Sequence, residues 1–204
     1  MPARKTPRPV PSARLDRDAW IDAARKSLIR EGIERVKVER LADDLKVTRG
    51  SFYWHFKNRE DLLSALLQSW RARNIDPFLK VLDHDGDQPG VQFRKYVNLW
   101  FSPKIYDPDY DSAVRDWARS APKVKRLVRE SDAARMAVLE KIYLAMGFAP
   151  TEAEVRARIT YYHQVGYYAM RIKESAAVRA ALLPTYVAIL AGPVGTAAYE
   201  DETK

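Results

Sequence analysis

The sequence predicts an all-α protein, and three observations carry that prediction. No segment alternates apolar and polar side chains with a period of two for long enough to form a strand. Apolar residues instead recur with helical spacing, as at Val38, Leu41, Ala42 and Leu45, which occupy positions i, i+3, i+4 and i+7. Helix caps and stop residues separate such stretches and predict about nine helices.

Residues 37–67 carry the pattern around which the N-terminal part is organised. They read as two short helices joined by a tight turn and followed by the start of a longer helix. Thr48 is expected to cap the second short helix, because its hydroxyl can satisfy the free backbone N–H of Ser51. Asn58 is expected to cap the longer helix, with Asp61 at the reciprocal position of a capping box.

The second short helix has two contrasting faces. Phe52 and the phenylalanine four residues later are expected to turn toward the first short helix. Arg49, Tyr53 and Trp54 then lie on the opposite side, beside Gly50. Such a face suits a helix that enters the major groove of DNA, where small residues near its N-terminus let the backbone approach. A further helix in residues 16–31 is expected to precede this helix-turn-helix.

At these residues the chain resembles a known family. Residues 47–63, VTRGSFYWHFKNREDLL, are similar to the DNA-binding signature of the TetR family of bacterial transcription regulators, and the resemblance covers roughly residues 16–67. Two positions depart from the family pattern. Val36 and Lys37 stand where a threonine pair is common, so that Lys37 would supply a charged phosphate contact. Lys46 replaces the usual turn glycine and must adopt the turn conformation at some strain.

The resemblance and the exposed face together predict the DNA contacts. Arg49 is the expected reader of a base edge, with Ser51 and Trp54 as secondary readers. The remaining predicted DNA-binding residues contact phosphate or allow close approach: Lys37, Thr48, Gly50, Tyr53, His55 and Lys57. Residues 1–75 hold 17 Lys and Arg against 10 Asp and Glu, which places most of the net charge of +8 on this part.

Residues 1–14 contain four prolines and four basic residues and are expected to be a disordered basic arm, either reaching along DNA or serving only as a tail. The expected domains are the helix-turn-helix domain in residues 15–62, a ligand-binding and dimerisation domain in residues 63–192, and a flexible tail in residues 193–204. The body helices are expected at residues 91–101, 112–119, 122–146, 151–172 and 176–190. Thr151 is an expected cap, Pro184 is expected to kink or split the last helix, and Gly192-Pro193 to end it.

Within the body, the resemblance implies a homodimer formed through the last two helices and a pocket for a small-molecule effector. Tyr162, Gly166 and Ala169 are expected at the dimer interface, with packing inside one chain as the open alternative. The expected pocket residues are mostly aromatic, a pattern that core packing would also produce: Tyr96, Trp100, Trp117, Arg135, Tyr143, Tyr161, His163 and Tyr167.

Composition bears on the competing classes of function. The chain has no cysteine, and its three histidines share no metal-binding or catalytic motif, so neither an enzyme nor a metal or other cofactor is expected. No apolar run long enough for a membrane span is expected, and the default location is the cytoplasm. The sequence therefore predicts a homodimeric repressor of a pseudopalindromic double-stranded DNA operator, released by a largely apolar effector. The alternative is a helical adaptor or ligand-binding protein without sequence-specific DNA binding.

Overall fold

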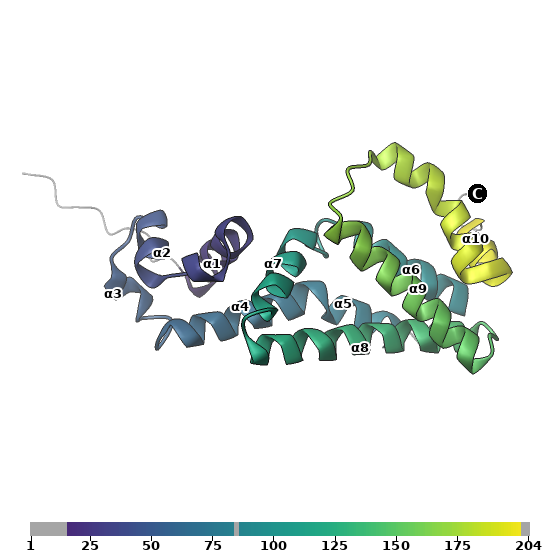
Figure 1. The fold of residues 1–204 in the computed structure, drawn as a ribbon, viewed down its shortest axis with the longest axis horizontal. Coiled ribbons are helices and arrows are strands. Elements are labelled where there is room, and N and C mark those ends of the chain that lie inside the picture. Colours follow the sequence, from purple (N-terminus) through teal and green to yellow (C-terminus); the bar gives the residue numbers. More distant parts are fainter. Residues whose placement is uncertain (1–15, 84–85, 201–204) are drawn as a thin grey trace, which may run out of the picture. The chain divides into compact units, whose positions relative to one another are not determined.

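The computed structural model describes residues 16–83 and 86–200, and every regular element in those ranges is helical (Figure 1). The described residues form ten α-helices and two short 3-10 helices, which confirms the all-α prediction. The chain divides into two compact units between Leu66 and Leu67, inside α4 (Arg59–Asn74). We call the described residues before this boundary the head and those after it the body.

The head begins with α1 (Arg17–Glu31) and continues through η1 (Ile33–Arg35), α2 (Val38–Asp44), α3 (Arg49–Phe52) and the first half of α4. Asp16 caps α1, because its Oδ1 accepts the backbone N–H of Ala19 at 2.8 Å. Gly32 ends the helix at φ +83°, a left-handed conformation that glycine adopts without steric cost.

Aromatic side chains form the centre of the head. Trp20 from α1 and Phe52 from α3 are both fully buried, and their rings meet edge to face with centroids 5.3 Å apart. Phe56 stacks on Phe52 at the same centroid distance. The prediction that both phenylalanines turn inward is confirmed, and their burial fixes which side of α3 faces solvent.

The body contains a series of helices that begin close to prolines, whose fixed φ and missing N–H suit the first turn of a helix. Its elements are the second half of α4, α5 (Asp76–Leu79), η2 (Lys80–Asp83), α6 (Pro89–Phe101), α7 (Pro108–Ala118), α8 (Pro122–Ala145), α9 (Pro150–Ala169) and α10 (Ala176–Glu200). Helix α8 packs against α6, α7 and α9, and α10 packs against α6 and α9.

Three helix starts differ from the prediction, and α6 begins two residues early, at Pro89. Helix α7 begins four residues early, at Pro108, because the side chain of Asp107 accepts the N–H of Tyr110 at 3.0 Å and caps it there. Thr151 is not a cap: α9 begins at Pro150, and Ala149 occupies the cap position without a side-chain hydrogen bond. The same helix ends at Ala169, three residues before its expected end.

The last helix is interrupted at a different residue from the one predicted. Pro184 lies inside α10 and the helix continues past it, whereas Gly192 has φ +62° and ψ −159° and breaks the helical path. The first helical segment therefore stops at Gly192, as expected for Gly192-Pro193, but a second segment follows to Glu200, so the expected tail is helical up to that residue. Gly195 follows the break, and a Cβ there would lie 2.1 Å from the Cβ of Ala191, so only glycine fits.

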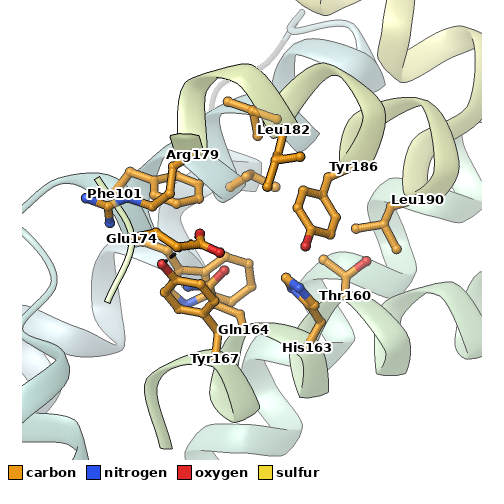
Figure 2. A pocket seen from close by; sticks show the side chains of 13 residues that line it. Phe101, Thr160, His163, Gln164, Tyr167, Glu174, Arg179, Leu182, Tyr186 and Leu190 are labelled. Carbon is orange, nitrogen blue, oxygen red and sulfur yellow. Dashed lines mark hydrogen bonds between the residues drawn. The ribbon is translucent and has the colours of Figure 1, made fainter. Parts of the chain in front are cut away.

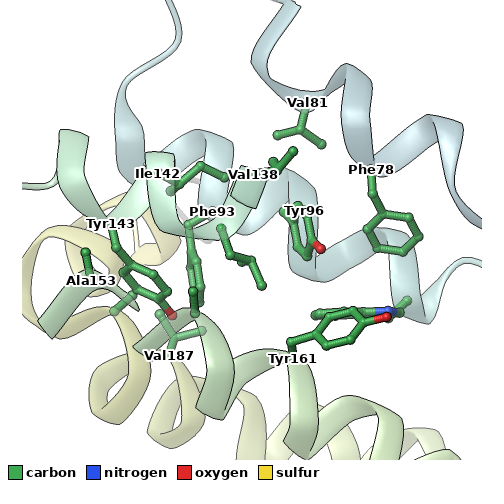
Figure 3. Packing of buried hydrophobic residues seen from close by; sticks show 14 of the residues in the cluster. Phe78, Val81, Phe93, Tyr96, Val138, Ile142, Tyr143, Ala153, Tyr161 and Val187 are labelled. Carbon is green, nitrogen blue, oxygen red and sulfur yellow. The ribbon is translucent and has the colours of Figure 1, made fainter. Parts of the chain in front are cut away.

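The body core is rich in tyrosine, and three of its buried hydroxyls have hydrogen-bond partners within the chain (Figure 3). Tyr96 donates to the backbone oxygen of Arg135 at 3.0 Å, and Tyr161 donates to Asp132 at 2.6 Å. The hydroxyls of Tyr143 and Thr160 bond to each other at 2.7 Å. Burial raises the pKa of Tyr143 to about 12, so these hydroxyls stay protonated and can donate.

Helix α10 corrects the expectation that no apolar run reaches the length of a membrane span. Ala177–Ala197 is a stretch of 21 residues with a mean hydropathy of 1.5, and only 11% of it is buried within the described structure. A single such helix is weak evidence for a membrane span, because a helix whose apolar face is covered by protein has the same composition.

Candidate functional site

A tight turn between α2 and α3 forms the helix-turn-helix of the head. The N–H of Lys46 donates to the backbone oxygen of Asp43 at 3.1 Å, and the N–H of Val47 donates to that of Ala42 at 3.0 Å. This pair of bonds closes the end of α2 in a Schellman motif, which requires a left-handed residue at its centre. Lys46 takes that conformation at φ +55°, as its position in place of a glycine predicts.

Helix α3 is a single turn, and it starts differently from the prediction. Thr48 occupies the cap position, but its side chain makes no capping hydrogen bond. The N–H of Ser51 instead donates to the backbone oxygen of Thr48 at 3.0 Å. The expected hydroxyl cap is therefore wrong, and the Thr48 side chain is exposed at the surface of the turn.

The surface of α3 opposite its buried phenylalanine is apolar and basic. Tyr53 is 64% exposed and Trp54 is 81% exposed. The side chain of Arg49 is 68% exposed, and its Nη1 lies 3.5 Å from Oε1 of Glu39 on α2. The ring of Tyr53 meets that of Phe52 edge to face with centroids 5.3 Å apart, yet most of its surface, like that of Trp54, remains open to a binding partner.

The other predicted DNA-binding residues surround this face on the head. Most of them are exposed, and two are half-buried beside the phenylalanine core. The exposed residues are Lys37, Thr48, Gly50 and Lys57, and the half-buried ones are Ser51 and His55. The head thus brings together one arginine, two lysines and two exposed aromatic side chains, a combination that suits phosphate and base edges.

The start of α4 fixes this surface to the head core. Oδ1 of Asn58 accepts the N–H of Asp61 at 2.9 Å, which confirms the predicted cap, and Oδ2 of Asp61 accepts the N–H of Lys57 at 3.0 Å. Arg59 adds a connection that the sequence analysis missed. Its Nε donates to the backbone oxygen of Val36 at 2.6 Å, and its Nη2 donates to that of Ile33 at 3.0 Å.

In the body, a pocket lies between α6, α9 and α10 (Figure 2). Three of the predicted ligand residues line it: Trp100 from α6, and His163 and Tyr167 from α9. The α10 side of the wall includes Tyr186 and Leu190, which the sequence analysis did not single out. Their contribution depends on α10 folding back over α6, an arrangement of distant segments that helical periodicity does not reveal.

The other five predicted ligand residues do not line this pocket. Tyr96, Trp117, Tyr143 and Tyr161 are buried in the packing of the body, and Arg135 is only 1% exposed. Nη2 of Arg135 donates to Asp132 at 3.0 Å, and Nη1 donates to the backbone oxygen of Asn74 at 3.3 Å. These aromatic side chains therefore serve the core, which was the open alternative for an aromatic pattern.

Arg135 belongs to a buried ionic network that joins α4, α7, α8 and α9. Arg115 on α7 donates to Asp111 at 2.8 Å and to both carboxylate oxygens of Asp132, at 2.9 and 2.7 Å. Nε1 of Trp70 on α4 donates to Asp111 at 3.1 Å. Burial acts to raise the pKa of Asp132, but hydrogen bonds and charge from Arg115 outweigh it and hold the pKa below its usual range.

The predicted dimer residues lie on one exposed stripe of α9. Tyr162 is 56% exposed, and a Cβ built at Gly166 would meet no side chain beyond its chain neighbours and no backbone of another segment within 4 Å. Ala169 is exposed at the end of the helix. Val155 and Ile159 continue the stripe toward the start of the helix and are 47% and 52% exposed.

The head matches a known protein family. The model of the bacterial regulatory proteins of the TetR family matches residues 21–66, which include α1, the helix-turn-helix and the start of α4. The head is a TetR-family domain. The resemblance found in the sequence is confirmed, and the chain carries the DNA-binding fold of this family of transcription regulators.

Individual relatives agree over the same part. The chain is 41% identical over 64 residues to the class D tetracycline repressor protein of Escherichia coli, an alignment that covers 31% of this chain and 29% of the repressor. It is also 41% identical over 49 residues to the transcriptional regulator TtgR of Pseudomonas putida, covering 24% of this chain and 23% of TtgR. The chain thus matches less than a third of either relative's length, and the body lies outside these TetR-type alignments.

Two solved structures are similar over more of the chain but at low scores. A crystal structure of BioQ with its natural double-stranded DNA operator covers 89% of this chain and 98% of BioQ, with 23% identity and a TM-score of 0.37. A TetR variant from Acinetobacter baumannii in complex with minocycline covers 76% of this chain and 75% of that chain, with 24% identity and a TM-score of 0.39. Scores this low support no conclusion about the body.

Proposed function

We propose that this chain is a transcription repressor that binds a pseudopalindromic DNA operator as a homodimer in the cytoplasm. The observation that carries the proposal is the exposed face of α3, where Arg49, Tyr53 and Trp54 project from a TetR-family helix-turn-helix. Arg49 would read a base edge, and Lys37 and Lys57 would contact phosphate.

A homodimer is supported by apolar surface that one chain leaves uncovered. The exposed stripe on α9 includes Ile159 and Tyr162, and α10 exposes Val178, Tyr186 and Ile189 to 47%, 40% and 68%. Apolar surface of this extent is typical of an interface. Two copies would bring two helix-turn-helix heads to half-sites one helical turn of DNA apart, or a multiple of it.

Regulation by an effector is the third part of the proposal. The pocket between α6, α9 and α10 has mostly apolar walls and opens beside helices of the proposed interface. A small, largely apolar molecule bound there would alter how the body holds α4, the helix that is shared with the head. Its binding would change the spacing of the two heads and release the operator.

Selection of bound duplexes from a random pool by the purified full-length protein tests this function. The proposal predicts enrichment of a palindrome whose half-sites are separated by about one helical turn or a multiple of it. Enrichment of an asymmetric site would contradict the homodimer. If no sequence were enriched while the protein remained folded, the operator-binding function would be wrong and the adaptor alternative favoured.

A further inference from the structure

The pocket between α6, α9 and α10 continues into a second hollow, and the two together define the shape of a ligand. The inner hollow has a volume of about 60 Å³ and the outer one about 240 Å³. Both are lined by Phe101, Arg179 and Leu183, so they adjoin along these side chains. A cavity of roughly 150 Å³ is needed to hold a benzene ring, so a ring-sized ligand must extend from the inner hollow into the outer one.

The walls of the inner hollow favour a flat molecule. Phe101 from α6, Tyr167 from α9 and Tyr186 from α10 surround it (Figure 2), and Trp100 from α6 also lines it. Aromatic walls bind planar rings by stacking and edge contacts, which contribute beyond the area that is buried. Leu182 and Leu190 complete an apolar lining that has no affinity for a strongly hydrated group.

The two charged groups at the pocket offset each other. Glu174 accepts a hydrogen bond from the hydroxyl of Tyr167 at 3.2 Å, and the guanidinium carbon of Arg179 lies 6.0 Å from the centre of the Phe101 ring. One carboxylate and one guanidinium at the same pocket give no net preference for an anion or a cation. The lining therefore suits an uncharged ligand.

One buried polar group remains to be satisfied. Gln164 is 6% exposed and lines the pocket, and among the described residues its Nε2 has no hydrogen-bond acceptor within 3.5 Å. A longer hydrogen bond to the hydroxyl of Tyr168 acts to lower the pKa of Tyr168 against the larger effect of burial, and that hydroxyl itself donates to the backbone oxygen of Trp100 at 2.7 Å. Because Nε2 carries two N–H groups, at least one of them remains without an acceptor. A buried N–H without an acceptor is costly, so an oxygen supplied by a ligand would be strongly favoured there.

We propose that this site binds an uncharged two-ring aromatic carbonyl compound whose carbonyl oxygen accepts a hydrogen bond from Nε2 of Gln164. The compound spans both hollows, from Trp100 across Phe101 into the outer one, because the inner hollow alone is too small for a ring. The inference rests on the proposed function, because it names the chemical class of the effector that would release the operator.

Calorimetric titration of the full-length protein with benzophenone and diphenylmethane tests the ligand class without DNA. The two probes share their rings and differ only in a carbonyl oxygen or a methylene. We expect benzophenone to bind at least tenfold more tightly than diphenylmethane, because only benzophenone supplies the missing acceptor. Equal affinities, or no binding of either probe, would overturn the proposal, as would equally tight binding of the anion 4-benzoylbenzoate.

Two variants assign the effect to Gln164. Gln164→Leu is expected to bind benzophenone no more tightly than diphenylmethane, while its affinity for diphenylmethane stays close to that of the wild type. Gln92→Leu alters a half-buried glutamine on α6 that does not line the pocket, and it should keep the tenfold preference. If Gln164→Leu kept the preference, the carbonyl would bind elsewhere and the assignment would be overturned.

Operator affinity distinguishes binding of this ligand class from its role as an effector. Operator affinity is measured with and without saturating benzophenone, and a drop of at least tenfold supports an effector role. Tight, Gln164-dependent binding with unchanged operator affinity would keep the ligand class and overturn the effector role. Operator binding by a protein that ignores benzophenone would overturn the ligand class and leave the DNA-binding function intact.

Discussion

At the scale of single residues, Arg49 and Lys57 are expected to act differently on DNA. Arg49→Ala should cost roughly 1–3 kcal/mol on the selected operator and relax the preference at one base position. Lys57→Ala should weaken binding to all duplexes alike and lower the slope of log affinity against log salt by about one. Titrations of both variants on the operator and on single-base variants of it measure the difference. An Arg49→Ala protein with unchanged sequence preference would refute the groove assignment.

Asp132 gives a prediction about pH. Its pKa is lowered in the folded protein, so its contribution to stability is present above the unfolded value near 3.9 and is lost as the pH falls through the folded value. Asp132→Asn should reduce the free energy of unfolding at neutral pH by about 3 kcal/mol, and the deficit should shrink toward the acid limb. Urea unfolding across pH measures this, with the exposed Asp116→Asn as control. A pH-independent deficit would show that the carboxylate charge is not responsible.

Sequence reasoning at this scale succeeded where a residue's role depends on its neighbours along the chain. The cap at Asn58 and the strained turn at Lys46 follow from local chemistry, and both are present. Arg59 was missed because its two acceptors lie on a segment more than 20 residues earlier in the chain. Arg135 was misplaced because an arginine near aromatic positions can fill a core as well as bind a ligand.

At the scale of elements, the turn between α2 and α3 has a residue that is poorly suited to its conformation. Lys46 adopts φ +55°, which costs an ordinary residue roughly 1–2 kcal/mol. Lys46→Gly should therefore be more stable than Lys46→Ala by about 1 kcal/mol, the reverse of the order found inside helices. Thermal unfolding of the two variants measures this difference. An alanine variant as stable as the glycine variant would mean that the turn is not left-handed at this position.

The sequence predicts where the helices lie better than it predicts the residues at which they begin and end. Helix α7 begins four residues before the expected helix at residues 112–119, because Asp107-Pro108, an Asx cap followed by proline, is itself a start signal. Pro184 was expected to interrupt α10, but the break falls at Gly192, where φ is positive. The length and exposure of α10 were also underestimated, since its apolar residues are spread around a helix that the rest of the chain leaves mostly uncovered.

At the scale of the whole molecule, the exposed stripe on α9 predicts the oligomeric state. Ile159→Glu places a charge in the proposed dimer interface and should convert the protein to a monomer, because an unpaired charge is strongly disfavoured there. Leu144→Glu replaces a side chain of similar exposure on α8 and should leave the dimer intact. Light scattering of the three proteins measures the mass. A wild-type monomer, or an Ile159→Glu dimer, would contradict the interface.

The candidate sites differ in how far sequence could define them. The proposed DNA-binding face comes from one contiguous stretch whose periodicity shows which side is buried, and the predicted residues lie around α3. The pocket is built from three helices that are distant in sequence, so only Trp100, His163 and Tyr167 of the predicted set reach it. Its α10 wall depends on tertiary packing, which amphipathic patterns do not specify.

The measurement that tests the central claim most directly is the affinity of the full-length protein for its selected palindrome and for a scrambled duplex across a range of salt concentrations. Specific readers prefer their site by a factor of roughly 10³ or more, and contacts to several phosphates give a steep salt dependence. We expect both properties, with two chains bound to each palindrome. Equal affinity for the two duplexes at every salt concentration would contradict the assignment of the exposed α3 face as a sequence-reading surface.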